Sequence, residues 1–391
     1  MPTPSARAFA LLSVLLACAP KGASTPPEPA KVATSVPPAL LGTELPSQPD
    51  PILEPVPAPE SEPEPEPEPA SLRVGSKGPL TEAQRAVLFG SPEDDVPPKR
   101  DGILGMHEEE HYITGNERTL DLWHEHIADV GGGYLGVGTD QGYLLVDWAR
   151  SDVAWFVDYD PEVQVVHELY RRFFMGADTP EELLALWGKD GRAAAKALLE
   201  AETEPARAKQ LTLAYDTYRA EIEKRLRKVE QRMRKVELPC YLTDLARYQH
   251  LRTMLEEGRI RPMLANLLDD RGVTGIAEAA RTLEVPIRVI YLSNAEQYWR
   301  RYAPQYRQNI AALPLADDAL LLRTLLRVSI DKDFHYNVQP ARNYVEWLQA
   351  PYVRNVYDIT GRPEYVKGVL SFFRSEGDPA RSSVGRRWLA A

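Results

Sequence analysis

Cysteine is almost absent from this chain: only Cys18 and Cys240 carry a thiol among 391 residues. If Cys18 is modified, Cys240 has no partner for a disulfide, so an ordinary apolar core must hold the folded part together. A basic tract is also lacking, and the formal net charge is -11. Nucleic-acid binders concentrate Lys and Arg on one surface. We therefore expect no nucleic-acid partner.

Several motifs that would identify a reaction are missing. The sequence contains no G-x-S-x-G elbow, no Walker loop and no C-x-x-C pair. It does contain H-E-x-x-H at residues 107–111, which on a helix could bind zinc through two imidazoles on one face. Flanking glycines leave little room for a long helix, so we interpret this segment as solvated and acidic. We assign no metal ligands.

The first 18 residues indicate where the protein is located. Arg7 precedes an apolar run at 8–17, which suits a signal peptide and is too short to span a bilayer. The run ends in Leu-Leu-Ala-Cys18, which resembles the lipobox of bacterial lipoproteins. This resemblance implies that Cys18 is lipidated; a plain secretory signal is the alternative. We expect a lipid-anchored protein of the cell envelope that faces outside the cytoplasm.

Composition divides the rest of the chain. Residues 19–75 are rich in Pro and Glu and cannot bury enough apolar surface to fold, so they predict a disordered tether. Residues 76–391 have a globular composition. Within them, about 179–240 reads as a charged helical insertion, either a hairpin or lid or a solvated surface helix. One apolar stripe would pack it: Ile222, Leu226, Val229, Met233 and Val236.

Strand and helix patterns alternate along the globular part. Strands are expected at 133–137, 153–160, within 259–270 and in the first half of 287–299, with further strands possible at 325–330 and near 353–359. Helices are expected at 82–90, 117–129, 143–151, 162–174, 244–257, 273–283, 317–328 and 341–349. Alternation of this kind predicts an α/β fold, a Rossmann-like doubly wound and mostly parallel sheet.

In such a sheet, ligands bind at the carboxyl ends of the strands. The first expected strand runs into a glycine turn that would let the backbone approach a ligand, and the next helix could be capped by Thr139 or Asp140. Asp158, after the second strand, stands at a spacing suited to ribose hydroxyls. The binding residues expected from these strand ends are Gly136, Gly138, Thr139, Asp140, Gln141, Asp158, Asn266, Asp269, Ser293, Asn294 and Glu296.

This order of strand ends is similar to that of class I S-adenosylmethionine-dependent methyltransferases. More narrowly, GGGYLGVGTDQGY (131–143), YLSNAEQY (291–298) and FHYNVQ (334–339) resemble a poorly characterised family of methyltransferase-like bacterial proteins. The resemblance covers roughly residues 105–340 and implies that the glycine turn, Asp158, Asp269 and the 293–296 loop line a pocket for S-adenosylmethionine. One departure is that glycines 131–133 replace the usual acid before the turn.

Candidate catalytic groups are sparse. His335, with Tyr336 beside it, follows an expected strand end and is the best available base or substrate-orienting group. Glu117 is a minor candidate, explained equally well as an exposed acid in a first helical turn. We expect a membrane-tethered, methyltransferase-like protein that binds S-adenosylmethionine or another small polar ligand. The alternative is a non-catalytic envelope lipoprotein whose repurposed fold binds a protein or small molecule.

Overall fold

The computed structural model describes residues 71–98, 110–326, 333–360, 372–375 and 377–390. Cys18, the expected signal peptide and most of the expected tether lie outside these residues, and so do residues 107–109 of the H-E-x-x-H motif. Val74, within the last part of the expected tether, is buried and donates its backbone N–H to Leu283. The folded unit therefore includes residues before position 76.

A seven-stranded sheet runs through the described part of the chain. Its strand order is β3 (Ile260–Leu264), β2 (Val153–Asp158), β1 (Gly133–Val137), β4 (Ile287–Tyr291), β5 (Leu315–Leu326), β6 (Phe334–Pro340) and β7 (Phe372–Arg374). The first five strands are parallel, β6 is antiparallel to β5, and β7 is parallel to β6. The prediction of an α/β fold with a mostly parallel sheet is confirmed.

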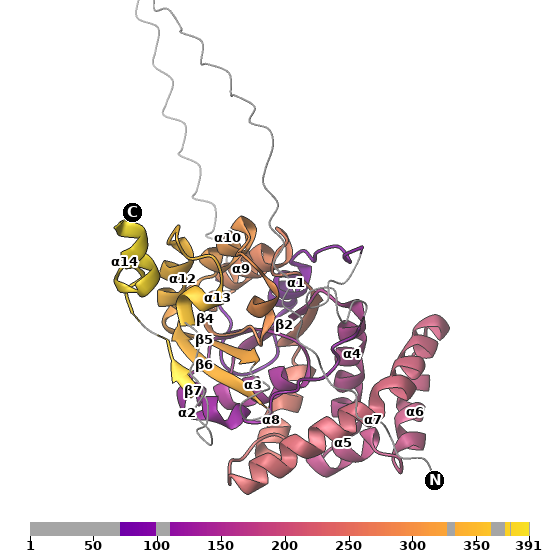
Figure 1. The fold of residues 1–391 in the computed structure, drawn as a ribbon. Helices are drawn as coiled ribbons and strands as arrows, with labels where there is room; N and C mark the ends of the chain where they lie inside the picture. The colour runs from indigo at the N-terminus through magenta and orange to yellow at the C-terminus, as the bar shows by residue number, and fades with distance from the viewer. Residues whose placement is uncertain (1–70, 99–109, 327–332, 361–371, 376, 391) are drawn as a thin grey trace, which may run out of the picture. The chain divides into compact units, whose positions relative to one another are not determined.

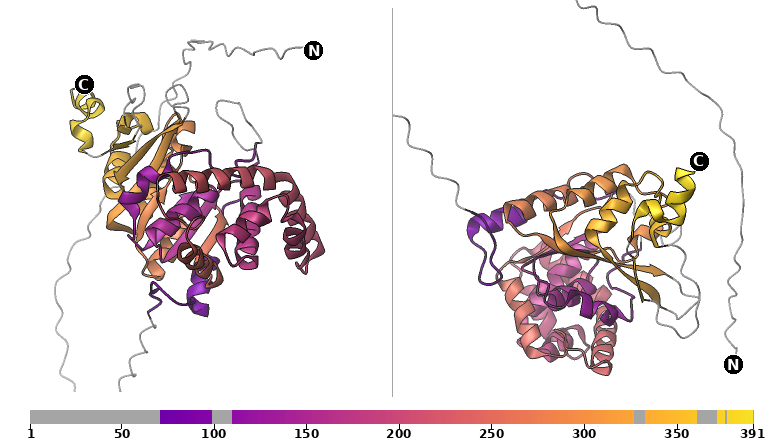
Figure 2. Two further views of the ribbon diagram at one scale, coloured as in Figure 1. Left: turned by 90° about the horizontal axis from the view of Figure 1, so that it is seen from below. Right: turned by 90° about the vertical axis from the view of Figure 1, so that its left-hand side faces the viewer.

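Helices cover both faces of this sheet, as Figures 1 and 2 show. One face carries α3 (Asp140–Ala149), α4 (Pro161–Gly176) and α8 (Leu245–Glu256); the other carries α9 (Gly272–Thr282), α10 (Pro304–Ala312) and α12 (Ala341–Gln349). Successive side chains of a strand point to opposite faces, so Tyr134 packs into the first layer and Leu135 into the second. Both are almost fully buried.

Shorter elements complete the described chain. α1 (Glu82–Gly90) begins with a capping box formed by Thr81 and Gln84. The others are η1 (Leu120–Trp123), α2 (His124–Ile127), η2 (Ala295–Tyr298), α13 (Val356–Thr360), η3 (Pro379–Arg381) and α14 (Ser383–Leu389).

The expected helical insertion consists of α5 (Pro180–Trp187), α6 (Arg192–Glu200) and α7 (Pro205–Lys235), which pack against α4. Four of the five stripe residues on α7 are buried, and Val236, just after the helix, is partly buried against the same core. The insertion is thus an apolar-packed part of the first helical layer, and α7 is joined to the start of α3 by the ion pair of Arg225 with Asp140.

Three expected elements differ in the structure. The sequence predicts a helix at 317–328 with a possible strand at 325–330, but residues 315–326 all form β5, between β4 and β6. A continuous apolar run fits a buried strand as well as a helix, and here the sheet pairing decides. Residues 356–360 form α13 rather than a strand, and the helix expected at 117–129 shortens to η1 and α2.

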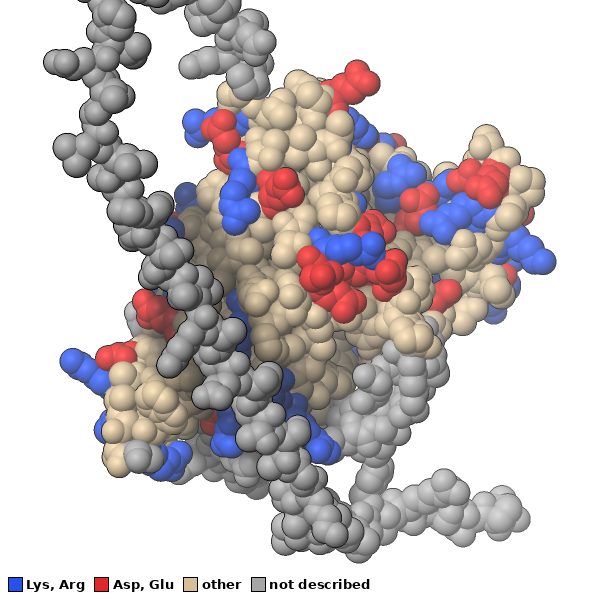
Figure 3. Space-filling view, turned by 90° about the horizontal axis from the view of Figure 1, so that it is seen from above, with Lys and Arg blue, Asp and Glu red and all other residues tan. Residues whose placement is uncertain are grey.

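Charge is mixed on the surface of the described part. On the face shown in Figure 3, acidic and basic side chains lie beside one another. Among the described residues, no helix is both long and apolar enough to cross a membrane.

Candidate functional site

The carboxyl ends of β1, β2 and β4 meet at the point where the strand order reverses direction. β1 lies between β2 and β4, and in doubly wound sheets this is where ligands bind. Gly138 donates its backbone N–H to Val157 of β2, at 3.3 Å, next to Asp158. Ser293 follows β4 at the same edge. The structure therefore brings Gly138, Asp158 and Ser293 together, as the strand ends predicted.

The glycines of the turn are needed for contacts within the chain. Gly138 has a φ of +84°, and a Cβ atom on it would lie 2.9 Å from Nε2 of Gln141. A Cβ on Gly136 would collide with the hydroxyl of Tyr134. We expected these glycines to leave space for a ligand. In the structure, side chains of the protein itself occupy the space beside them.

The start of α3 is covered by a preceding segment, residues 113–117. Thr139 does not cap the helix with its side chain; its hydroxyl donates to the carbonyl of Ile113 at 2.7 Å. Asp140 is buried, and its Oδ1 accepts the backbone N–H of Gly115 at 2.6 Å. Its Oδ2 accepts Nε–H of Arg225 at 2.7 Å. Segment 113–117 and α7 therefore both attach to the residue that opens α3.

Glu117 is the central acid of this edge and is fully buried rather than exposed. Its Oε1 accepts hydrogen bonds from the hydroxyls of Tyr291 and Ser293, each at 2.7 Å. Its backbone carbonyl accepts Nη1–H of Arg225. Because η1 begins only at Leu120, Glu117 lies in a loop before the helix, and the interpretation as an exposed first-turn acid is wrong.

Four buried polar atoms at this edge have no hydrogen-bond partner among the described residues. They are Oε2 of Glu117, Oε1 of Gln141, Nη2 of Arg225 and the hydroxyl of Tyr134. A Cβ on Gly115 would lie 2.8 Å from the Gln141 atom and 2.9 Å from the Glu117 atom, so these two acceptors flank one point. Buried polar groups in native proteins are almost always satisfied by protein, water or ligand. We define these four residues as the polar cluster.

Asp158 and its neighbours form a more open rim beside the cluster. Asp158 is half-buried, and its Oδ1 accepts the backbone N–H of Asp160 at 3.0 Å. Burial is the main cause that raises the pKa of Asp158 to about 7. Asp160 caps α4 through Glu162 N–H and lies 2.8 Å from Nδ1 of His111. The rim therefore carries a carboxyl group whose protonated form is favoured by burial.

The remaining predicted residues lie elsewhere or are engaged within the core. Asn266 and Asp269 form a local turn after the edge strand β3, where the Asn266 amide donates to Asp269 at 3.1 Å. Asn294 is half-buried and directly precedes η2. Glu296 is buried in the second helical layer, 3.3 Å from Arg323, and accepts the hydroxyl of Tyr344 at 2.7 Å. The expectation that Glu296 lines the cleft is wrong, because its carboxylate is buried and paired with Arg323.

The two expected catalytic residues lie on different faces of the sheet. His335 and Tyr336 are adjacent inside β6, so they point to opposite faces of the sheet. Both are buried, and the Tyr336 hydroxyl accepts the backbone N–H groups of Arg118 and Thr119 at 2.9 Å. Burial also raises the pKa of Tyr336 far above its ordinary value. Tyr336 therefore holds the backbone that follows Glu117 in place. Its raised pKa keeps the hydroxyl protonated, which does not suit a base.

These contacts bear on the expected cofactor. Gln141 fills the side of the turn next to Gly138, and the contacts of Thr139 and Asp140 hold segment 113–117 directly on the start of α3. The residues over the turn do not fit an S-adenosylmethionine molecule that crosses it. Within the described residues, no group of three His, Cys, Asp or Glu side chains is placed to hold a metal ion.

Comparison with known proteins places the chain in a family. Residues 112–374 match the family described as "Domain of unknown function (DUF7790)", and since this span exceeds half of the chain, the protein belongs to that family. No curated protein matches the chain. The matched span includes segment 113–117, the glycine turn and the helical insertion, so every residue of the polar cluster lies within the family domain.

Proposed function

We propose that this member of the DUF7790 family is a non-catalytic, membrane-tethered binding protein with a Rossmann-like domain, which holds a small polar ligand at the polar cluster. The first five strands support the Rossmann-like assignment, because they follow the order 3-2-1-4-5 of doubly wound nucleotide-binding folds. A fold of this kind serves many activities, so its chemistry has to be argued from the site.

The unpartnered atoms of Glu117 and Arg225 carry this proposal. Glu117 presents one unused carboxylate oxygen, an acceptor, and Arg225 presents one unused terminal NH2 group, Nη2, a donor. An unsatisfied buried group costs roughly 1–3 kcal/mol, and more when it is charged. A compact ligand with both a hydrogen-bond donor and an acceptor would satisfy the two residues at once. Gln141 and Tyr134 add an acceptor and a hydroxyl within the same cluster.

Methyl transfer is less well supported than binding. The glycine turn is covered by the chain's own residues, and the expected base His335 and its neighbour Tyr336 face opposite sides of the sheet. The S-adenosylmethionine expectation remains a prediction, which calorimetry with S-adenosylmethionine and S-adenosylhomocysteine tests. Absence of both heat of binding and a rise in melting temperature with either compound would contradict that prediction.

A ligand screen tests the proposal directly. Melting temperatures would be measured with glycine, glutamate, glycine betaine and citrate, which present different combinations of ammonium and carboxylate groups. We expect at least one to stabilise the protein and to lose this effect in Glu117→Gln, which replaces the unused acceptor by a donor.

The matched control is Glu125→Gln. This substitution removes the same charge, and the Glu125 side chain is exposed. Equal responses of the two variants would refute a ligand at Glu117. Stoichiometric binding of S-adenosylmethionine would instead support the methyltransferase reading.

A further inference from the structure

A groove of about 650 Å³ opens between α1, α4, the start of α7 and the turn from α8 into β3. Its volume falls in the range of small-molecule sites. None of the four residues of the polar cluster lines it, so it is separate from the site proposed above. Tyr143 and His167 lie at its buried side, and Gly258 and Ile260 mark the amino end of β3.

Apolar side chains supply much of the groove surface. Phe89 on α1 is 44% exposed, which is unusual for so large an apolar residue. Met175 on α4 and Leu255 on α8 line the same groove, together with Ile260 and Pro262 of β3. An occupant with an apolar body would remove this surface from water.

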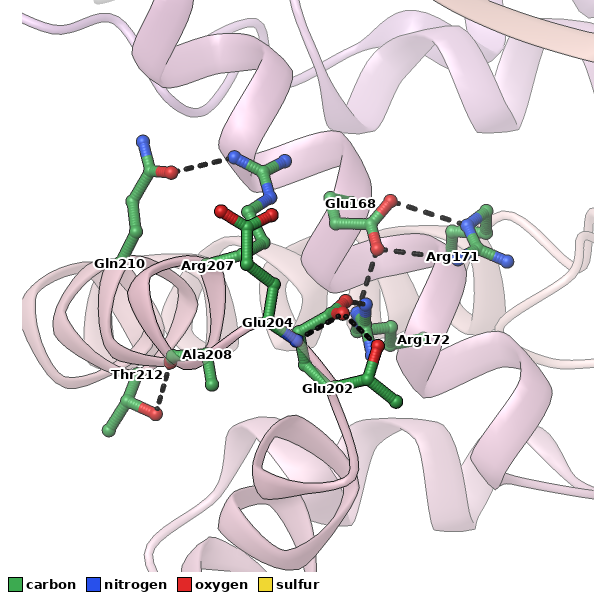
Figure 4. A network of polar contacts seen from close by, with 10 residues as sticks. Glu168, Arg171, Arg172, Glu202, Glu204, Arg207, Ala208, Gln210 and Thr212 are labelled. Atoms are coloured by element: carbon green, nitrogen blue, oxygen red, sulfur yellow. Dashed lines mark hydrogen bonds and ion pairs between the residues drawn. The ribbon is translucent and has the colours of Figure 1, made fainter.

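The three acids of the groove are already neutralised by arginines. Glu168 pairs with Arg171 and Arg172, at 3.3 and 2.7 Å, and Figure 4 shows its carboxylate joined to both. The other two pairs are Glu256 with Arg252 and Glu93 with Arg261, each at 3.5 Å. Their negative charge is therefore balanced before any ligand is considered.

Two further arginines of the groove have no carboxylate partner among the described residues. Arg207 donates to the amide oxygen of Gln210 at 2.7 Å, as Figure 4 shows. Arg85 donates to the backbone carbonyl of Glu257 at 3.1 Å and lies over the Phe89 ring, 5.8 Å from its centroid. Because Arg171 is paired with Glu168, Arg85 and Arg207 are the two arginines of the groove that make no ion pair with a described carboxylate.

Arg85 is also held in place by the backbone beneath it. Gly258 has a φ of +71°, and any Cβ there would collide with the Arg85 guanidinium. The ring of Phe89, the carbonyl of Glu257 and the bare backbone of Gly258 therefore fix this arginine before a ligand arrives. Such preorganisation lowers the entropy lost on binding.

His167 does not add to the positive charge. Its Nε2 donates to the carbonyl of Gly138 at 3.1 Å, so Nδ1 accepts the hydroxyl of Tyr143 at 3.0 Å. Burial lowers the pKa of His167 to about 4, so the ring is neutral at physiological pH. An extended peptide adding to the sheet edge is also disfavoured, because Pro262 lacks a backbone donor in the middle of β3.

We propose that this groove binds one dissolved anionic amphiphile, with its carboxylate, phosphate or sulfonate head group at Arg85 and Arg207 and its apolar body along Phe89, Met175 and Leu255. Two arginines without a described carboxylate partner, beside an exposed aromatic surface, match a single charged head on an apolar body. A groove of about 650 Å³ suits one molecule rather than a bilayer surface.

Calorimetry with laurate, below its micelle-forming concentration, tests this proposal on the full chain. We expect one equivalent to bind, and the double variant Arg85→Gln/Arg207→Gln to bind about tenfold or more weakly, since two charge contacts are lost. The matched control is Arg192→Gln/Arg227→Gln, which removes two cations paired with Asp216 and Glu230 outside the groove. It should bind as the unchanged protein does.

Additional measurements separate the alternatives. Dodecyltrimethylammonium carries the opposite charge on the same chain length and should bind far more weakly than laurate. Equal binding of the two, equal affinities of the two double variants, or no heat with laurate would each overturn the proposal. So would binding to anionic phospholipid vesicles without binding of dissolved laurate, because the groove would then recognise a membrane surface.

Discussion

Gly138 shows at the scale of one residue why a glycine turn need not be a ligand site. Its left-handed backbone requires glycine, and the amide of Gln141 occupies the space beside it. Sequence reasoning identified the turn and its position at the end of β1 correctly. It could not identify what fills the turn, because Gln141 contacts Gly138 only once α3 has begun at Asp140.

Replacing Gly138 by Ala should reduce the free energy of unfolding by two separable effects. A left-handed residue with a Cβ costs about 1–2 kcal/mol, and the new methyl group must also displace Gln141. Gly78 is the matched control, because its φ is +88° and nothing lies within 4 Å of its Cβ position. Urea denaturation should show a larger loss for Gly138→Ala than for Gly78→Ala.

Gln141→Ala combined with Gly138→Ala should recover part of that additional loss. If Gly138→Ala and Gly78→Ala lose the same free energy of unfolding, the contact with Gln141 does not contribute to stability.

His167 predicts a pH dependence of stability. Its folded-state pKa of about 4 lies below the unfolded value of about 6.5, so the unfolded chain takes up the proton first as the pH falls. Stability that His167 contributes is thus complete above pH 6.5 and is lost towards pH 4, on the order of 3 kcal/mol. His167→Gln does not titrate, so its urea midpoint should fall less between pH 6.5 and 4.5. Parallel pH profiles would contradict this assignment.

At the scale of the element, α7 tests whether the insertion belongs to the core. Leu226 is fully buried in the stripe and Leu213 is 67% exposed on the same helix. Leu226→Ala should lower the free energy of unfolding by about 2–5 kcal/mol, because it leaves a cavity. Leu213→Ala should change it by less than about 0.5 kcal/mol. Similar small effects in both variants, measured by urea unfolding, would mean that α7 is only loosely attached.

Elements with a strong local signal were predicted well, and those decided by pairing were not. The bounds of α1, β1 and α12 agree with the sequence prediction, because caps, glycines and periodic apolar residues mark them. Helix α3 begins three residues earlier than expected, at Asp140. β5 was predicted as a helix because its leucines suit either state, and only hydrogen bonds to β4 and β6 make it a strand.

At the scale of the whole molecule, sequence predicted the location of the site better than its residues. Parallel strands place their carboxyl ends at one edge, which is why Gly138, Asp158 and Ser293 meet. Glu117 and Arg225 lie 108 residues apart in sequence, and only the packing of α7 onto the first helical layer brings them together. The sequence itself marked Glu117 only as an acid shortly after Gly115, and Arg225 only as one of many cations on a charged helix.

Attachment to the membrane is the prediction that concerns the whole chain. If Cys18 is lipidated, its acyl chains contribute about 0.8 kcal/mol per buried CH₂ group, and removing them should release the protein. Cys18→Ala should therefore move the protein from the membrane fraction to the soluble fraction of a bacterial host. Cys240→Ala is the control, since Cys240 is the other thiol and is buried in the folded unit. Mass spectrometry of the mature N-terminus identifies the acylated cysteine, and a Cys18→Ala protein that stays with the membrane would show that something other than this lipid holds it there.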